Sequence, residues 1–226
     1  MTSTPNVSVV IPVGPSDANR RWLNEAVTSV LNQTYRPYPD IVIVDDMAGM
    51  DPYMVPRDLL TYWRSPWYLG VAHAFNIGVA VAPSDLVFML GSDDTLEPDC
   101  ILECVETYKE RRDRDGYYYV GVRYTDTNEL QEVPCHAAMV TKSLWRLTGG
   151  FPIESASGSP DAALISIIFG NYPRAGRHWQ VANGRPLYNY RRHSESFSGR
   201  APYWQGIIME TRDHVTREWY PRQPHD

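Results

Sequence analysis

The first ninety residues alternate between short continuous apolar runs and longer stretches whose apolar residues recur at helical spacing. The short runs are rich in β-branched residues, which is typical of parallel strands covered on both faces. The pattern predicts strands at 7–13, 41–44, 59–63 and 85–90, and helices at 20–35 and 69–81. Strands and helices in this order are typical of a doubly wound α/β sheet.

The second half of the chain is less regular. Its pattern predicts helices at 100–111, 161–170 and 203–220, strands at 117–124 and near Gln180 and Leu187, and a strand running into a short helix within 137–151. No repeat and no long linker interrupts it. We therefore expect a single domain over residues 1–226, with a C-terminal helical tail.

Composition, net charge and cysteine content limit the classes of protein to which the chain can belong. The chain has 226 residues, 43% of them hydrophobic, and a formal net charge of −6, which does not favour broad binding to nucleic acid. No apolar run approaches the ~18 residues of a membrane span. The three cysteines lack CxxC spacing, and the N-terminus lacks the features of a secretory signal. These features predict reduced thiols, no membrane span and a cytoplasmic location.

Two acidic pairs follow predicted strands, Asp45-Asp46 after the second and Asp93-Asp94 after the fourth. In open α/β sheets, ligands bind beyond the carboxyl ends of the strands. Adjacent carboxylates repel each other and are costly to desolvate unless a cation is near, so Asp93-Asp94 is a candidate site for a divalent metal. The alternatives are a helix N-cap before Pro98 for this pair and a solvated turn for Asp45-Asp46.

Six segments together resemble the family 2 glycosyltransferases, over about residues 7 to 200. They are VSVVIPV, LNEAVTSVLNQTY, IVIVDD, GVAHAFNIGVAVAPSDLVFMLGSDD, LTGGF and YRRHSES. The resemblance implies a GT-A fold, with a Rossmann-like mixed sheet flanked by helices. It also implies a metal-dependent, inverting transfer of a sugar from a nucleotide-diphosphate sugar to an acceptor hydroxyl. Residues 1–98 would then bind the nucleotide and residues 99–226 the acceptor.

By this resemblance, Asp94 is the direct metal ligand, Asp93 lies near the ribose or donor sugar, and His193 completes the metal shell. Ser92, in the same motif, is a further residue expected to bind the donor nucleotide. A cation that bridges a diphosphate needs hard oxygen ligands, and an added imidazole shifts the preference from Mg²⁺ toward Mn²⁺. Gly91 stands where many relatives carry the first aspartate of the motif. The smaller number of carboxylates predicts weaker metal binding, with the ion arriving mainly with the nucleotide.

The resemblance also places the nucleobase and ribose. Asp45 and Asp46 would contact them, and Pro12 and Val13 would pack against the base. A carboxylate can accept the N3–H of uracil or donors on other bases, so the pair fits nucleotide recognition without naming the base. Among nucleotide-diphosphate sugars, we expect a UDP-sugar as donor. Gly14-Pro15 replaces the family's usual Tyr-Asn at the end of the first strand.

Three further residues are implied in nucleotide binding. Asn76 matches the asparagine of the family's Arg-Asn pair, while Phe75 stands in the place of the arginine. His73 could take over part of the arginine's role or be a structural residue of the helix. Arg191 and Arg192, beside His193, could neutralise phosphate charge.

The resemblance implies that Asp161 is the catalytic base, with Pro160 in place of the glutamate that usually precedes it. An inverting transfer needs a carboxylate near the acceptor hydroxyl. Alternatively, Asp161 only favours the start of its helix, and Glu154 is then the reserve candidate.

Two other functions compete with this interpretation. A nucleotidyltransferase shares the acidic strand ends, but "VGPSDANRR" is poor in the glycines of its usual loop. A non-catalytic sugar-nucleotide-binding module is suggested by the departures at Gly91, Phe75 and Pro160. The acceptor could be a glycan, a protein or a modified nucleobase.

Overall fold

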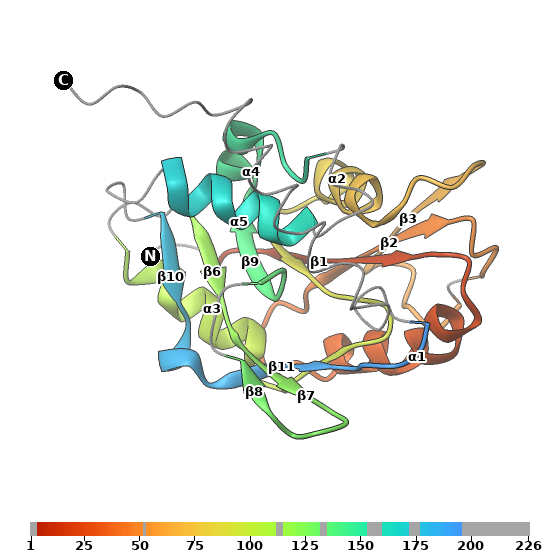
Figure 1. Cartoon of the computed structure of the whole chain (residues 1–226), viewed down its shortest axis with the longest axis horizontal. Helices are drawn as coiled ribbons and strands as arrows, with labels where there is room; N and C mark the ends of the chain where they lie inside the picture. The colour runs from red at the N-terminus through yellow and green to blue at the C-terminus, as the bar shows by residue number, and fades with distance from the viewer. Residues whose placement is uncertain are drawn as a thin grey trace.

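The computed structural model describes residues 4–51, 53–111, 115–131, 135–152, 160–171 and 177–195. Within them the chain forms a seven-stranded sheet with strand order β10-β6-β9-β4-β1-β2-β3 and a four-stranded sheet with order β5-β11-β7-β8 (Figure 1). The large sheet contains β1 (Val7–Val13), β2 (Asp40–Asp46), β3 (Leu60–Ser65), β4 (Leu86–Met89), β6 (Tyr117–Tyr119), β9 (Ala138–Thr141) and β10 (His178–Gln180). The small sheet contains β5 (Thr95–Leu96), β7 (Gly121–Tyr124), β8 (Leu130–Gln131) and β11 (Pro186–Tyr190).

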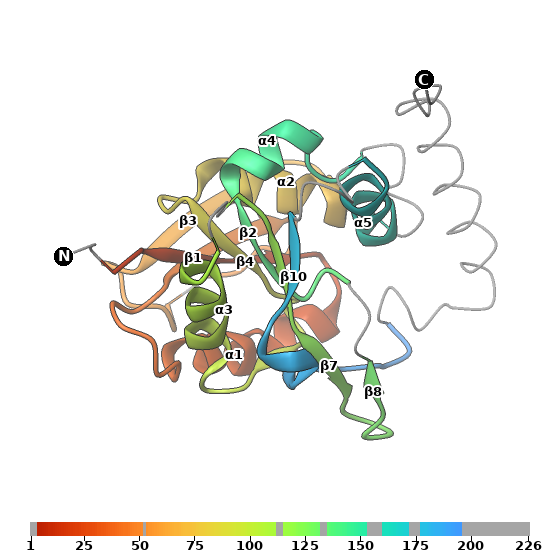
Figure 2. The ribbon, with the colours of Figure 1, turned by 90° about the vertical axis from the view of Figure 1, so that its left-hand side faces the viewer.

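Helices cover both faces of the large sheet. They are α1 (Asp17–Leu31), α2 (Val71–Val81), α3 (Cys100–Lys109), α4 (Lys142–Thr148) and α5 (Pro160–Asn171), with a short 3₁₀ turn at Ala182–Gly184. Helices α1 and α3 lie on one face, and α2, α4 and α5 on the other (Figures 1 and 2). Successive residues of β1 serve both layers, because Val9 and Ile11 belong to one core cluster and Val10 to the other. The predicted mixed α/β sheet flanked by helices is confirmed.

The four strands predicted in the first half form the parallel part of the sheet. Strands β3, β2, β1 and β4 lie side by side in parallel, and all seven residues of β1 are buried. Val13 pairs with Asp45, and Leu90 N donates to Val10 O just beyond β4. Both acidic pairs therefore lie at the same edge of the sheet, where ligands bind in such folds.

The prediction of one strand over 117–124 is wrong. Strand β6 joins the large sheet and β7 joins the small one, with a break at Val120. At the break, the backbone of the 3₁₀ turn passes so close to Gly121 that a Cβ there would lie 2.1 Å from Gly184 O. Only glycine permits the backbone of the 3₁₀ turn to come this close, and the chain passes from the large sheet to the small one at this point.

The other predictions for the second half agree with the structure where it describes them. Residues 137–151 form β9 and α4, which begins with the Thr141 side chain accepting from Leu144 N and ends at Gly149 in the left-handed conformation. The predicted helix at 203–220 lies outside the described residues. All three cysteines are free thiols, as predicted. Among the helices of the described ranges, none combines the length and apolar character needed to cross a membrane.

Candidate active site

Asp94 lies at the centre of a buried hydrogen-bond network beyond β4. Its side chain accepts a hydrogen bond from the Tyr188 hydroxyl at 2.6 Å and another from the backbone N–H of Arg191 at 2.7 Å. Burial, with a smaller contribution from the charge of Asp93, raises the pKa of Asp94 to about 7. The alternative of an N-cap is wrong, because Asp99 holds that position before α3.

Gly91 is required by this geometry. A Cβ at this position would lie 2.5 Å from Asp94 Oδ2 and 3.0 Å from Asp93 Oδ1. The backbone N–H of Gly91 also donates to the Tyr188 hydroxyl at 2.9 Å. The two carboxylates fold back over the glycine, so an aspartate at position 91 would not fit this arrangement.

Asp93 and His193, one hundred residues apart in sequence, lie in contact. His193 Nε2 is 2.9 Å from Asp93 Oδ2. The backbone N–H of Glu195 donates to His193 Nδ1 at 3.3 Å, which assigns the ring proton to Nε2 as donor to Asp93. The structure thus brings the last of the six segments onto the acidic loop after β4.

The two predicted metal ligands, Asp94 and His193, together with the neighbouring Asp93, offer two carboxylates and one imidazole, a donor set that suits Mn²⁺ or Mg²⁺. Among the described residues, however, no group of three His, Cys, Asp or Glu side chains is arranged to hold an ion by itself. An ion would need further oxygens, which a diphosphate can supply. The assignments of Asp94 and His193 as metal ligands stay predictions.

Helix α1 supports the segment that carries His193. The Trp22 ring centroid lies 4.6 Å from that of His193, and the Arg191 guanidinium lies 4.7 Å from the same indole. Arg191 also donates to Glu25 at 2.6 Å and to the backbone oxygen of Asp93 at 2.9 Å. Trp22, counted in the sequence among the apolar positions of the helix, is only partly buried and faces this segment.

Arg192 points to a different part of the molecule. Its guanidinium donates to Asp126 at 3.0 Å and to the Thr127 hydroxyl at 3.0 Å, in the turn between β7 and β8, and lies 4.4 Å from the Tyr124 ring. Its charge is therefore paired on the small sheet. A phosphate contact for Arg192 stays a prediction.

Asp45 is completely buried at the end of β2. Its carboxylate accepts hydrogen bonds from the backbone N–H groups of Gly49 and Met50 and from the Tyr62 hydroxyl, at 2.5 to 3.2 Å. The alternative of a solvated turn is therefore wrong. Asp45 fixes the loop after β2, and its contact with a nucleotide stays a prediction.

Asp46 is also buried, and it holds the approach to α2. It accepts hydrogen bonds from the backbone N–H groups of Leu69 and Gly70 at 2.7 and 2.8 Å. Burial outweighs these bonds and raises its pKa. His73, proposed as a partial substitute for the family's arginine, lies in the first turn of α2, and its buried Nδ1 has no hydrogen-bond partner among the described residues.

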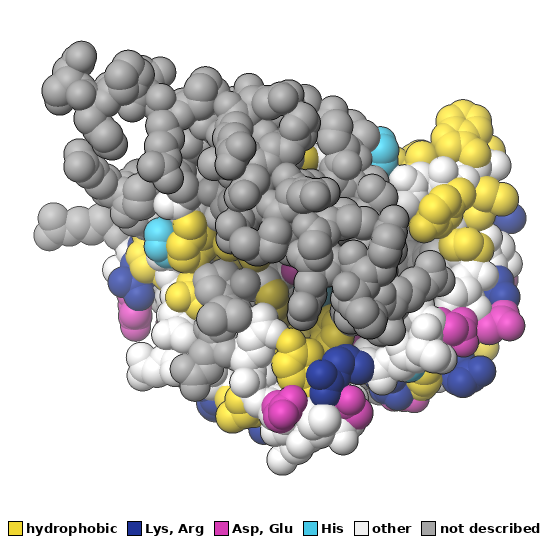
Figure 3. Space-filling view, in the orientation of Figure 1, with side chains coloured by type: hydrophobic (Ala, Val, Ile, Leu, Met, Phe, Trp, Pro, Cys, Tyr) yellow, Lys and Arg dark blue, Asp and Glu magenta, His cyan; other side chains and the backbone are white. Residues whose placement is uncertain are grey.

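Exposed hydrophobic side chains lie on the loops that follow β2 and β3. They gather over this end of the sheet in Figure 3, and the members are Met47, Tyr53, Trp67 and Tyr68. The two loops are the ones that Asp45 and Asp46 tie down. Hydrophobic surface therefore borders the acidic pair predicted to bind the nucleotide.

Asn76 and Phe75 hold the Gly-Gly-Phe turn. The side-chain amide of Asn76 donates to Phe151 O and accepts from Phe151 N, both at 2.9 Å. The Phe75 ring packs against that of Phe151, with centroids 5.5 Å apart. Asn76 has a positioning role in the structure, and its contact with a nucleotide stays a prediction. Of the other predicted residues, Pro12 and Val13 are buried at the end of β1, and Ser92 beyond β4.

Asp161 is connected to Asp94 through two side chains that the sequence analysis did not identify. Its Oδ2 lies 3.5 Å from His136 Nδ1, and His136 Nε2 lies 3.2 Å from the Tyr188 hydroxyl, which binds Asp94. His136 carries no motif, and Tyr188 belongs to a short alternating strand. No local signal in the sequence could have paired them. The predicted base and the predicted metal carboxylate therefore share one network.

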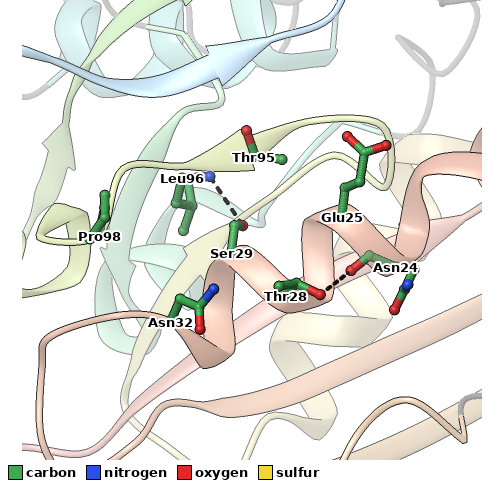
Figure 4. A pocket seen from close by; sticks show the side chains of 8 residues that line it. All are labelled: Asn24, Glu25, Thr28, Ser29, Asn32, Thr95, Leu96 and Pro98. Atoms are coloured by element: carbon green, nitrogen blue, oxygen red, sulfur yellow. Dashed lines mark hydrogen bonds between the residues drawn. The ribbon is translucent and has the colours of Figure 1, made fainter.

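A groove of about 350 Å³ lies between α1 and β5 (Figure 4). Its lining residues are Asn24, Glu25, Thr28, Ser29, Asn32, Thr95, Leu96 and Pro98. The Ser29 hydroxyl accepts from Leu96 N at 3.1 Å, and the Thr28 hydroxyl donates to Asn24 O at 2.6 Å. These hydroxyls are used to tie β5 to α1 and to bond within the helix.

Known proteins are similar to this chain in sequence and in fold. The family described as glycosyl transferase family 2 matches residues 8–155. An uncharacterized glycosyltransferase of Mycobacterium tuberculosis is 24% identical, over 92% of this chain and 98% of its own length. Glycosyltransferase GlyG of Streptococcus pneumoniae is 27% identical over 52% of this chain and 39% of its own length.

Among solved structures, TarS 1–349 of S. aureus in complex with UDP-GlcNAc superimposes with a TM-score of 0.72 at 12% identity. The match covers 94% of this chain and 70% of TarS 1–349. This likeness confirms the predicted GT-A fold. Because the family match covers well over half of the chain, the protein belongs to glycosyl transferase family 2 and is a glycosyltransferase.

Proposed function

We propose that this protein transfers a sugar from a UDP-sugar to an acceptor hydroxyl, with inversion at the sugar and with the help of a divalent cation. The proposal rests on one network of polar side chains at the strand ends. His193 contacts Asp93, which precedes Asp94 in the chain. Asp161 is linked to Asp94 through His136 and Tyr188. The donor class is supported by TarS, which was solved with UDP-GlcNAc and with UDP.

On the donor side, Asp94 and His193 bind the cation, Mn²⁺ or Mg²⁺, and Ser92 and Asp93 lie near the ribose or the donor sugar. When bound, the cation acts as a Lewis acid that stabilises the leaving diphosphate. Asp94 is held by two hydrogen bonds, so its carboxylate is already oriented before the ligand arrives.

On the nucleotide side, the base and ribose lie against the loops fixed by Asp45 and Asp46 and the end of β1 at Pro12 and Val13. The remaining nucleotide contacts that we propose are those of Asn76, Arg191 and Arg192. Residues 1–98 thus serve as the nucleotide-binding half and residues 99–226 as the acceptor-binding half of one domain. We place the protein in the cytoplasm on its three free thiols.

On the acceptor side, Asp161 removes the proton from the attacking hydroxyl. Its side chain is about a quarter exposed (26%) at the start of α5, so an acceptor can reach it. The acceptor is a hydroxyl of a glycan, a protein or a modified nucleobase, and the net charge of −6 disfavours the last.

A non-catalytic binding module is the competing function. Two of the departures that suggest it, Gly91 and Phe75, have structural reasons, since Gly91 makes room for Asp94 and Phe75 packs on Phe151. Both departures are therefore compatible with activity.

Thermal unfolding with UDP, with and without MnCl₂, tests the proposal. Saturating UDP and Mn²⁺ should raise the melting temperature by about 5–10 °C, because a ligand at about 100 times its Kd adds about 2.7 kcal/mol. Asp94→Asn should remove the metal-dependent part, while Asp58→Asn, on an exposed turn before β3, should not. An unchanged response of Asp94→Asn would show that the metal site is wrongly placed.

Release of UDP from UDP-GlcNAc, with water as acceptor, separates an enzyme from a binding module. A transferase releases UDP slowly in this assay, and Asp94→Asn does not. Binding of UDP and Mn²⁺ without release from any UDP-sugar would favour the module.

A further inference from the structure

His136 lies just before β9 and is held on several sides. Its side chain is 21% exposed, and its ring makes edge contacts with Tyr188 and Tyr190, at centroid distances of 5.4 and 5.9 Å. Its two nitrogens face different partners, Nδ1 toward Asp161 and Nε2 toward the Tyr188 hydroxyl. The ring is therefore fixed between the acceptor-side and donor-side carboxylates.

The hydrogen bonds of Tyr188 determine what Nε2 does. The single hydroxyl proton of Tyr188 is donated to ionised Asp94 at 2.6 Å, and the hydroxyl oxygen accepts from Gly91 N at 2.9 Å. With that proton used, His136 Nε2 acts as a donor to the hydroxyl oxygen at 3.2 Å.

Nδ1 faces a carboxylate, and this favours a second proton on the ring. Burial alone would lower the pKa of His136, but the hydrogen bond to Asp161 and its charge outweigh burial and raise the pKa. The raised pKa means that Asp161 favours the protonated ring, in which Nδ1 donates to the carboxylate. An ionised carboxylate is the form that a general base requires.

We propose that His136 is a positioning residue for sugar transfer, which orients Asp161 toward the acceptor through Nδ1 and couples it to the donor-site carboxylate Asp94 through Nε2 and Tyr188. The inference rests on the proposed function, because it takes Asp161 as the base. In the reaction, the acceptor O–H proton passes to Asp161, the acceptor oxygen bonds to the anomeric carbon, and the bonding pair to the old oxygen leaves with the diphosphate.

Two substitutions of His136 test the contacts of its two ring nitrogens one at a time. Asparagine places its amide near the position of Nδ1, and glutamine places its amide near that of Nε2. We expect His136→Gln to slow UDP release from UDP-GlcNAc by about 10- to 100-fold, with KM changed by less than about 3-fold. His136→Asn should stay within about 5-fold of the parent, because it keeps a polar partner for Asp161.

A purely structural His136 predicts another result. Both variants would then melt at lower temperature and lose turnover to the same extent, and that outcome would overturn the proposal. Equal turnover of His136→Gln and the parent would overturn it as well, while leaving the proposed function in place. A parent that neither binds UDP nor releases it from UDP-GlcNAc would reject the proposed function, and the role of His136 with it.

A measurement on the free protein tests the contact without any activity. In ¹⁵N NMR of the histidine rings, Asp161→Asn should move the Nδ1 signal of His136 and leave His193, which contacts Asp93 instead, unchanged. His136→Gln assigns the signal by its loss. An unmoved His136 signal in Asp161→Asn overturns the proposal, whatever the turnover.

Discussion

Asp161 could contribute to catalysis or to the start of α5, and the two roles predict different results. A carboxylate in the first turn of a helix interacts favourably with the helix dipole, and asparagine keeps most of the size and hydrogen-bonding ability. If Asp161 is the base, Asp161→Asn should lower turnover by about 10²-fold or more. UDP affinity and melting temperature should change little, because the side chain lies on the acceptor side.

Turnover of UDP-GlcNAc, UDP affinity and thermal unfolding on the same variant decide between the roles. Capping alone predicts slightly lower stability with nearly normal turnover. Normal turnover would transfer the role of base to Glu154, which lies outside the described residues.

The site residues that could be predicted are those that belong to motifs at strand ends. Asp93 and His193, which the resemblance singled out, lie in contact, and their implied roles stay predictions. His136 and Tyr188 had no motif. Their partners lie 25 to 97 residues away, and only the three-dimensional fold brings such residues into contact.

A second reason why the roles of single residues could not be predicted is that their hydrogen-bond partners are unknown from the sequence. Asp45 and Asp46 were interpreted as nucleotide contacts or a solvated turn, and Asn76 as a nucleotide contact. The structure shows the polar atoms of all three bonded to the protein backbone. A buried carboxylate or amide needs such partners, and the sequence does not reveal which ones it finds.

At the scale of elements, buried parallel strands were the most predictable part of the chain. Strands β1, β2 and β4 are continuous apolar runs because helices cover both of their faces. The break between β6 and β7 was missed because apolar residues run through it. Gly121 was the available signal, since a glycine inside a strand often marks a close backbone approach.

The segment 191–195 depends on α1 for its position. Glu195 accepts from the Ser16 hydroxyl at 3.0 Å, Arg191 binds Glu25, and the rings of His193 and Trp22 are in contact. Three links to one helix fix where the imidazole lies relative to Asp93.

Because segment 191–195 is held against α1, we expect substitutions at Trp22 and His193 to have non-additive effects on binding of UDP with Mn²⁺. Trp22→Leu should weaken binding of UDP with Mn²⁺ by about 5-fold and His193→Ala by about 10-fold, since each removes part of a positioned ligand set. In the double variant the Trp22 effect should disappear, because no imidazole remains to be positioned. Isothermal titration calorimetry on the four proteins measures this directly.

Trp179→Leu is the matched control, because Trp179 stacks on Tyr118 in β6, at 4.9 Å. It should lower stability without changing UDP affinity. Additive effects of Trp22→Leu and His193→Ala would mean that the indole does not act through the histidine.

At the scale of the whole molecule, buried titratable groups of the site make the free energy of unfolding depend on pH. The folded protein raises the pKa of Asp94, mainly by burial, above the value in the unfolded chain. A raised carboxyl pKa means that the folded state holds a proton that the unfolded state has released, so stability falls as pH rises from about 4 to about 7. The pKa values of Asp46 and His136 are also raised, so these two groups likewise make stability fall as pH rises. Burial lowers the pKa of His178, so this group makes stability rise with pH.

Asp94→Asn isolates the contribution of Asp94. Asparagine cannot ionise, and its Oδ1 can still accept from Arg191 N. At pH 8 without metal, we expect the variant to melt at least about 4 °C above the parent, because one pKa unit is worth about 1.4 kcal/mol and 1 kcal/mol shifts a chain of this size by about 2–4 °C. The difference should shrink below pH 7 and vanish near pH 3, where Asp94 keeps its proton in the folded state and largely in the unfolded state.

Mn²⁺ with UDP should reverse the order at pH 8, because the cation binds the ionised carboxylate and competes with the proton. Bound UDP and Mn²⁺ then stabilise the parent, whereas the asparagine variant keeps only the part of the gain that does not depend on the metal. At pH 5 the same addition should have a smaller effect on the parent, because Asp94 holds its proton there. A parent that gains as much from UDP and Mn²⁺ at pH 5 as at pH 8 would show that the cation does not bind at Asp94.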